Sequence, residues 1–152
     1  MNQIEFKGKS IRYYVQGEGE VLVLVHGYME ALEIWNGFAG ELSKNFKVIR
    51  MDLPGHGKSD VIEDTHSMEL LADAVNAVLN EEKVGKCTMV GHSLGGYVTL
   101  AFLEKYPEKL RRLSLYHSHP FADNENVKKN RQKEIELVKN DKKSDIFDTN
   151  VP

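Results

Sequence analysis

An unbroken apolar run, Val21 to Val25, narrows the range of folds open to this chain. The run consists of valines and leucines only, and it is too short for a typical helix. A strand that is apolar on both faces must be buried on both faces, because neither set of side chains can face water. Burial of this kind is typical of a parallel sheet with helices on both sides, so we expect a central strand here.

Strands and helices are predicted to alternate around this run. Alternation of this kind indicates an α/β fold with a mostly parallel, twisted sheet, helices on both faces and right-handed crossovers. A turn at Lys7-Gly8-Lys9 separates the first two strands, and Gly17-Glu18-Gly19 precedes the third. The expected strands are residues 2–7, 10–16, 21–25, 46–51, 87–90 and 110–116.

Three helices are expected to cover the sheet, each with apolar residues at helical spacing. Ser67 can cap the second helix, and Pro107 marks the end of the third. The residues available for packing are Ala31, Trp35, Phe38 and Leu42 in the first helix; Leu71, Ala74, Val75 and Val78 in the second; and Val98, Phe102 and Leu103 in the third.

The composition changes from about Asp123, where Lys, Glu, Asp and Asn of mixed charge dominate. Val127, Ile135 and Val138 still recur at helical spacing, which predicts an amphipathic helix to about residue 140. We therefore expect two parts, a core of residues 1–121 and an amphipathic helix with a tail in residues 122–152.

The composition excludes several classes of protein. The net charge of -3 provides no basic field for nucleic acid or for an anionic membrane. The single cysteine, Cys87, rules out an intramolecular disulfide framework, and its apolar neighbours predict a small buried side chain. Residues 1–14 lack the apolar region of a signal peptide, and no apolar run approaches the length of a membrane span. We expect a cytoplasmic protein with no nucleic-acid or membrane partner.

The segment Gly91-His92-Ser93-Leu94-Gly95-Gly96 matches the pattern G-x-S-x-G between a predicted strand and a predicted helix. The small residues Gly91 and Gly95 permit a tight, strained turn, which raises the Ser93 hydroxyl above the sheet. The N-terminus of the following helix favours a negative charge beside that hydroxyl. Ser93 is therefore the candidate nucleophile.

Two further segments follow predicted strands: His26-Gly27-Tyr28, and the loop from Asp52 to Ser59 with the pattern D-x-P-G-x-G-x-S. With these three motifs, residues from about 10 to 120 resemble the α/β-hydrolase superfamily, particularly its small esterase, lactonase and haloperoxidase-like members. The resemblance implies an oxyanion hole formed by the backbone N–H groups of Tyr28 and Leu94. It also implies that residues 122–152 are the start of a cap.

The other polar residues near these motifs are expected to support the site. We expect His26 to anchor the loop that begins at His26 and carries the Tyr28 N–H (the oxyanion loop) through hydrogen bonds. We expect Asp52 and His56 to structure their own loop. His117 and His119 suggest a metal site, but no third ligand accompanies them, so we expect them at the mouth of a pocket. The residues expected to support the strained turn at Ser93 (the nucleophile elbow) and the oxyanion loop are His26, Gly27, Gly91, His92 and Gly95.

A serine nucleophile needs a base, and in this fold the triad runs in the order Ser, acid, His. The family carries its His after the eighth strand and its acid usually after the seventh. The last histidine here is His119, after the sixth predicted strand. Asp123 also follows the sixth strand, where a minority of the family carry the acid, but it lies several residues beyond the strand end. The resemblance therefore implies a hydrolase fold that lacks its last strands, with the catalytic acid and His absent.

Two explanations for this absence remain open, a fragment of a longer enzyme or a natural short form that binds without hydrolysing. The first predicts a serine hydrolase of carboxylic esters or lactones that acts through an acyl-enzyme, with no cofactor or metal. Thioesters, carbon–carbon bonds and haloperoxidase side activity are alternatives. The second predicts a non-catalytic receptor that uses the same pocket for a small molecule.

Two expectations concern the 152-residue chain by itself. Without a base, it should be inactive. It should also self-associate, because residues 110–116 form a sheet edge and an apolar face near Trp35 and Phe38 lacks its covering helix.

Overall fold

The computed structural model describes residues 1–142 and 144–146. By its internal contacts the chain divides into two compact units, residues 1–120 and residues 121–152. The strands are β1 (Asn2–Phe6), β2 (Lys9–Gln16), β3 (Glu20–Val25), β4 (Phe46–Met51), β5 (Cys87–His92) and β6 (Leu110–Tyr116). The helices are α1 (Asn36–Leu42), α2 (Met68–Glu81), α3 (Leu94–Lys105) and α4 (Glu125–Lys139), with short 3₁₀ turns at η1 (Leu32–Trp35) and η2 (Pro107–Lys109).

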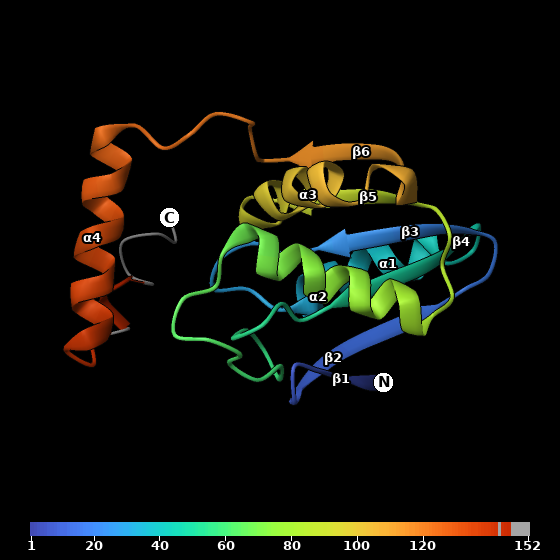
Figure 1. Ribbon diagram of the computed structural model, residues 1–152, viewed down its shortest axis with the longest axis horizontal. Helices are drawn as coiled ribbons and strands as arrows, with labels where there is room; N and C mark the ends of the chain where they lie inside the picture. Colours follow the sequence, from blue (N-terminus) through green and yellow to red (C-terminus); the bar gives the residue numbers. More distant parts are fainter. Residues whose placement is uncertain (143, 147–152) are drawn as a thin grey trace. The chain divides into compact units, whose positions relative to one another are not determined.

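The strands of the first unit form one sheet in the order β1-β2-β4-β3-β5-β6 (Figure 1). Three pairs of neighbours are parallel: β4 with β3, β3 with β5, and β5 with β6. Two pairs are antiparallel: β1 with β2, and β2 with β4. The predicted α/β fold with a mostly parallel sheet is thus confirmed. Parallel pairing also brings the carboxyl ends of β3, β4 and β5 to the same edge, where the three predicted motifs follow them.

The apolar run in β3 is buried on both faces of the sheet, as predicted. Successive side chains of a strand point to opposite faces. Val23 and Val25 accordingly belong to the core cluster that contains the apolar residues of α2 and α3. Leu22 and Leu24 belong to a second cluster on the other face, with residues of η1 and α1. Helices therefore cover both faces, and β3 lies at the centre of the core.

Phe38 was predicted to share one apolar stripe with Trp35, and Leu103 was predicted to be available for packing; both assignments are wrong, although the exposure of Phe38 agrees with the expected uncovered apolar face. Phe38 is 55% exposed and Leu103 is 39% exposed. The first helix begins as the 3₁₀ turn η1, so its residues do not follow one α-helical stripe, and Phe38 leaves the face on which Trp35 is buried. In α3 the buried face is set by Val98 and Phe102, and Leu103 lies one residue off that face. Trp35, expected to be uncovered, is only 4% exposed.

Two other predicted local features are confirmed, the cap of α2 and the burial of Cys87. The Ser67 hydroxyl accepts a hydrogen bond from the Leu70 N–H and caps α2, and Glu69 follows in the first turn. Cys87 is buried, which raises the pKa of its thiol to about 11. In the part of the chain that the structure describes, we find no helix with the length and apolar character of a membrane span.

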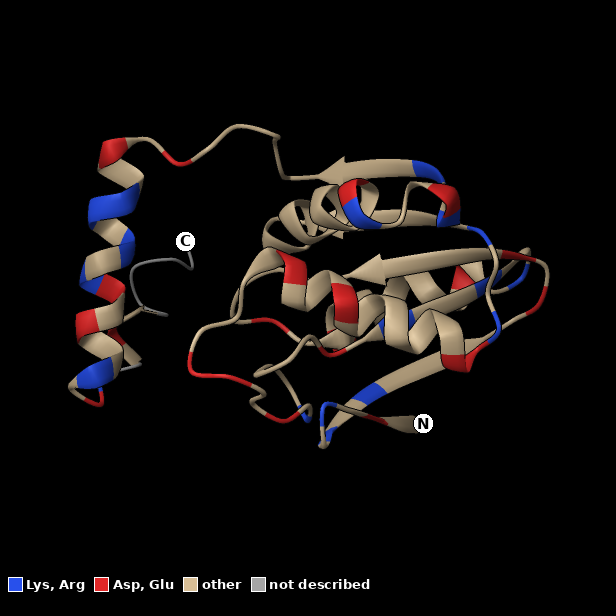
Figure 2. Ribbon diagram, viewed as in Figure 1, with Lys and Arg blue, Asp and Glu red and all other residues tan. Residues whose placement is uncertain are grey.

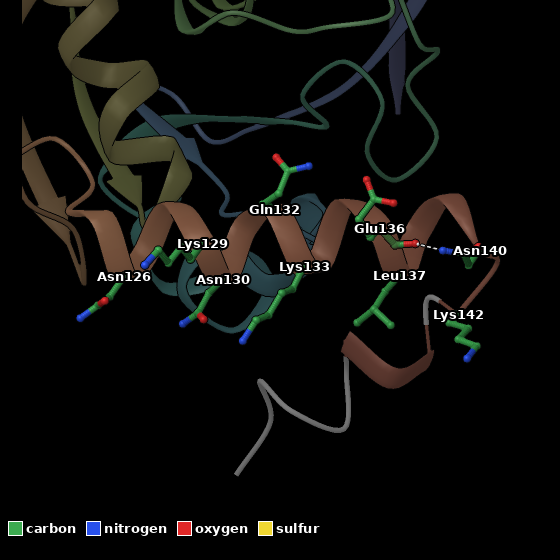
Figure 3. A pocket seen from close by; sticks show the side chains of 9 residues that line it. All are labelled: Asn126, Lys129, Asn130, Gln132, Lys133, Glu136, Leu137, Asn140 and Lys142. Atoms are coloured by element: carbon green, nitrogen blue, oxygen red, sulfur yellow. Dashed lines mark hydrogen bonds between the residues drawn. The ribbon is translucent and has the colours of Figure 1, made fainter.

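The second unit contains α4, the amphipathic helix predicted from the sequence. The Asn124 side chain accepts from the N–H groups of Asn126 and Val127 and caps the helix. Both basic and acidic residues occur along it (Figure 2). A hollow of about 1000 Å³ lies along one side of α4, and apart from Leu137 polar side chains line it (Figure 3). Its lining includes none of the site residues predicted from the motifs.

Candidate active site

Ser93 lies between the end of β5 and the first residue of α3, on a strained turn. Its φ of 48° and ψ of -113° fall in a region that residues with a side chain rarely adopt. Surrounding hydrogen bonds hold this conformation. The Ser93 N–H donates to the Tyr116 carbonyl at 3.1 Å, and the Ser93 carbonyl accepts from the Gly96 N–H at 2.9 Å and from the Ser118 hydroxyl at 2.8 Å.

The glycines of the motif lie where backbones approach closely. A Cβ at Gly91 would lie less than 3.0 Å from backbone atoms of Gly95 and Gly96. A Cβ at Gly95 would be equally close to the carbonyl oxygens of Val25 and His26. No side-chain rotation can relieve contacts with backbone, so both positions require glycine. The same approach brings the start of α3 against the end of β3, where the His26-Gly27-Tyr28 segment begins.

His26 is fully buried and joins the ends of β3 and β4. Its Nε2 accepts from the Leu53 N–H at 2.9 Å, so the ring proton resides on Nδ1, which donates to the Gly27 carbonyl at 2.7 Å. Burial lowers the pKa of His26 to about 4, against the opposing effect of the bond to Gly27. The imidazole is therefore neutral near pH 7.

The His26 bond also orients the next peptide group. The Gly27 carbonyl and the Tyr28 N–H belong to one planar, trans peptide, so the N–H points away from the side on which the carbonyl is held. Tyr28 is 43% exposed, and its ring lies edge-on to the His56 ring with centroids 6.5 Å apart. Nδ1 of His56 also donates one bond within its own loop, to the Pro54 carbonyl at 3.1 Å.

Asp52 is fully buried and braces the loop that follows β4. Its carboxylate accepts from the Lys58 N–H and the Leu32 N–H, both at 2.8 Å, and from the Arg12 guanidinium at 2.5 Å. Burial disfavours the charged form, but these hydrogen bonds outweigh it and hold the pKa of Asp52 below its usual value. Asp52 therefore connects β2, the start of η1 and the glycine loop, as expected for a bracing residue.

Glu30 was not anticipated from the sequence. One of its carboxylate oxygens accepts from the Gly27 N–H at 2.5 Å and lies 2.8 Å from Nδ1 of His92. Carboxylates often accept a backbone N–H from a residue close in sequence, and the spacing of three between Gly27 and Glu30 is the one signal that could have revealed this contact. The link to His92, which is 62 residues distant, depends on the tertiary fold.

Aromatic rings surround His92 at the carboxyl ends of β5 and β6. The His92 ring centroid lies 6.4 Å from that of Trp35, 5.5 Å from that of Tyr116 and 6.0 Å from that of His117. The His119 ring has a different neighbour, Tyr97, at 5.8 Å. Within residues 1–142 and 144–146, we find no cluster of three His, Cys, Asp or Glu side chains that could hold a metal.

Among the described residues, the Ser93 hydroxyl has no hydrogen-bond partner. Asp123, the alternative for the triad acid, forms an ion pair with Arg131 within the second unit. Leu94 is the first residue of α3, so its N–H has no acceptor within the helix. The described site thus contains a strained serine and a helix N-terminus, and no described side chain is hydrogen-bonded to the serine hydroxyl.

Comparison with known proteins agrees with this geometry. Residues 20–144 match a family model described as alpha/beta hydrolase fold. A pimeloyl-[acyl-carrier protein] methyl ester esterase of Aeromonas hydrophila is 36% identical over 105 residues, which represent 68% of this chain and 40% of that enzyme.

Two solved structures show the same arrangement. A thermophilic esterase from Thermogutta terrifontis aligns with a TM-score of 0.94 and 30% identity, over 100% of this chain and 58% of that one. Est816, described as an N-acyl homoserine lactone degrading enzyme, aligns with a TM-score of 0.75 and 30% identity, over 77% of this chain and 45% of that one. The chain spans only the N-terminal part of these relatives, and less than two thirds of the length of each.

Proposed function

Because the chain belongs to the alpha/beta hydrolase fold family, we propose that it supplies the nucleophile and the oxyanion hole of a serine hydrolase for carboxylic esters or lactones. The observation that carries this proposal is the backbone of Ser93, whose φ of 48° places it on a strained turn between β5 and α3. Strain of this kind persists where the surrounding structure enforces it, and it is concentrated at functional sites.

In the proposed reaction, Ser93 Oγ attacks the carbonyl carbon of the substrate and passes its proton to a base. The carbonyl π electrons move to oxygen, and the backbone N–H groups of Tyr28 and Leu94 donate to this oxyanion. Collapse of the tetrahedral intermediate breaks the bond to the leaving alkoxide, which takes the proton from the base. Water then attacks the acyl-enzyme by the same sequence, releasing the acid and restoring Ser93.

The supporting residues act through position. Neutral His26 holds the Gly27 carbonyl, which fixes the peptide that carries the Tyr28 N–H. Gly91 and Gly95 let the backbones of β5, α3 and β3 approach closely, which brings the start of α3 against the segment that leads to that peptide. The partial positive charge at the N-terminus of α3 adds to the stabilisation of the oxyanion.

The base and the acid of the triad are proposed to come from residues outside those described. The 152-residue chain by itself should then be inactive, and residues 122–152 would be the start of a cap. The relatives include an esterase and a lactone-degrading enzyme, which supports esters or lactones as the substrate class. We also propose a cytoplasmic location, which fractionation of the source cells would test.

Turnover of a p-nitrophenyl ester tests the proposal. The full-length protein should hydrolyse it, and Ser93→Ala should lose about 10⁴-fold or more in kcat. The 152-residue chain should show no turnover above this residual level. Activity in the chain that approaches that of the full-length protein would mean that a described residue serves as base, and His117 and His119 would be the first to replace.

The second candidate is a receptor that binds a small molecule in the same pocket without hydrolysing it. The described residues bear on this candidate only in that the Ser93 hydroxyl has no hydrogen-bond partner among them. It predicts that the full-length protein does not turn over p-nitrophenyl esters, and that a ligand raises its melting temperature.

Self-association of the 152-residue chain is also proposed. Within the described part of the chain, β6 pairs only with β5 and occupies the edge of the sheet, where its other side offers N–H and C=O groups without a strand partner. Leu113 and Tyr116 are exposed on this strand. Sedimentation over a concentration series should show the average mass rising with concentration, whereas a monomer at every concentration would refute the proposal.

A further inference from the structure

One carboxylate oxygen of Glu30 joins the two segments that the proposed reaction brings together. It accepts from the Gly27 N–H in the oxyanion loop, at 2.5 Å, and from Nδ1 of His92 in the elbow, at 2.8 Å. Glu30 is 26% exposed and His92 is 22% exposed, so water reaches both side chains only in part. The bridge therefore differs from an exposed ion pair, whose two partners are free to separate.

The backbone of the loop supports this bridge. Met29 adopts a left-handed conformation, with φ of 58°, which is uncommon for a residue with a long side chain. The turn brings Glu30 back over the loop, so closely that a Cβ at Gly27 would lie 2.7 Å from the bridging oxygen. A side chain at position 27 would therefore displace the Glu30 carboxylate from this bond.

His92 is itself held in place. The rings of Trp35 and Tyr116 lie against its imidazole, at centroid distances of 6.4 Å and 5.5 Å. Trp35 is only 4% exposed, so it provides a rigid side to this contact. His92 therefore offers Glu30 a fixed donor from β5, the strand that leads into Ser93.

The two polar groups of Gly27 are thus held from opposite directions. His26 donates to its carbonyl, and Glu30 accepts from its N–H. The His26 bond orients the peptide that carries the Tyr28 N–H, and the Glu30 bond fixes the preceding peptide. Without the second bond, rotation about the Gly27 backbone could move the Tyr28 N–H away from the oxyanion, since glycine has few steric limits.

We propose that Glu30 is a positioning residue, which through His92 locks the oxyanion loop to the nucleophile elbow and so aims the Tyr28 N–H at the reacting oxygen. The inference rests on the proposed serine hydrolase function. A donor of this kind must lie within a few tenths of an ångström of its working distance, so loosening the loop should slow the chemical step more than it weakens substrate binding.

The test compares Glu30→Ala, Glu30→Gln and wild type in the full-length protein. Glu104→Ala is the matched control, because Glu104 is an exposed glutamate on α3 with no hydrogen bond or ion pair among the described residues. Glu30→Ala should lower kcat about 10- to 100-fold and leave KM within about threefold. Glu30→Gln keeps an oxygen that can accept from Gly27 and His92, so its kcat should stay within about threefold of wild type.

A second measurement reports on the loop without depending on turnover. Amide hydrogen exchange of Gly27 should accelerate at least about tenfold in Glu30→Ala and remain slow in Glu30→Gln. The Leu53 amide, which donates to His26, should exchange at the wild-type rate in both variants. This internal control separates a local release of Gly27 from general destabilisation.

Several results would overturn the inference: an unchanged Gly27 exchange rate in Glu30→Ala, an unchanged kcat despite faster exchange, or equal losses in Glu30→Ala and Glu30→Gln. If wild type does not turn over the ester, the proposed function fails on that result. The Gly27 exchange rates then decide by themselves whether Glu30 locks the loop.

Discussion

The strained backbone of Ser93 predicts an unusual order of stability among its variants. At φ of 48° and ψ of -113°, any residue with a Cβ bears a conformational cost of about 1–3 kcal/mol, which glycine avoids. Glycine also has a more flexible unfolded chain, which costs about 0.4–1 kcal/mol relative to alanine. At the middle of both ranges, the difference leaves Ser93→Gly more stable than Ser93→Ala by about 1.3 kcal/mol.

Ser43 provides a matched control. It follows α1 with φ of -66° and ψ of -10°, an ordinary helical conformation, so the order there should reverse. Ser43→Ala should be more stable than Ser43→Gly by about 0.4–1 kcal/mol. At both positions the alanine and glycine variants lose the hydroxyl alike, so each comparison isolates the backbone effect.

Urea unfolding measures both pairs. With a slope of about 2 kcal/mol per molar, the predicted difference at position 93 shifts the midpoint by about 0.65 M in favour of glycine. Equal slopes within each pair would show that the variants unfold from comparable states. If Ser93→Ala proves as stable as Ser93→Gly while the Ser43 pair behaves as expected, the turn is not strained and the reasoning for an enforced elbow is wrong.

Three further predictions concern the residues that support the site. The pKa of His26 is about 4 in the folded chain and 6.5 in its ordinary state, so the unfolded chain takes up the proton first as the pH falls. The free energy of unfolding should therefore be at its full value above about pH 6.5 and decline by about 3 kcal/mol towards pH 4. Urea unfolding should show a weaker decline in His26→Gln, and an equal decline would contradict the assignment. Asp52→Asn leaves the buried guanidinium of Arg12 without its closest carboxylate, although Arg12 keeps its ion pair with Glu33. Thermal unfolding should therefore show a loss of stability near about 3 kcal/mol, the low end of the usual cost of breaking a buried ion pair. A loss under about 1 kcal/mol would contradict this. Gly95→Ala should lower the free energy of unfolding by about 1–3 kcal/mol, because its Cβ meets the backbone of β3. Gly40→Ala has open space around it in α1 and should raise the free energy of unfolding by up to about 1 kcal/mol. Equal effects of the two substitutions would refute the steric argument.

Much of the fold could be predicted because its determinants are local. The apolar run of β3 specifies burial on both faces, and the alternation of strands and helices specifies parallel pairing. The G-x-S-x-G segment is also local, since the glycines, the serine and the flanking elements lie within a few residues of one another. These features need no knowledge of distant contacts.

The remainder depends on contacts between distant segments. Nothing in the sequence joins Arg12 to Asp52, which are 40 residues apart, or Glu30 to His92. Phe38 was misplaced because the 3₁₀ turn before α1 changes the angular spacing of its residues, which a helical stripe cannot anticipate. Sequence patterns therefore locate the nucleophile and its two loops, while the bonds that hold these loops together require the structure.

The most direct test of the account is covalent labelling of Ser93. A fluorophosphonate probe reacts with an activated serine, so the full-length protein should gain one adduct, and peptide mass spectrometry should find it on Ser93. Ser93→Ala should remain unlabelled, and heat-denatured protein should not react. Labelling that persists in Ser93→Ala, or that maps to another serine, would contradict the assignment of Ser93 as the nucleophile.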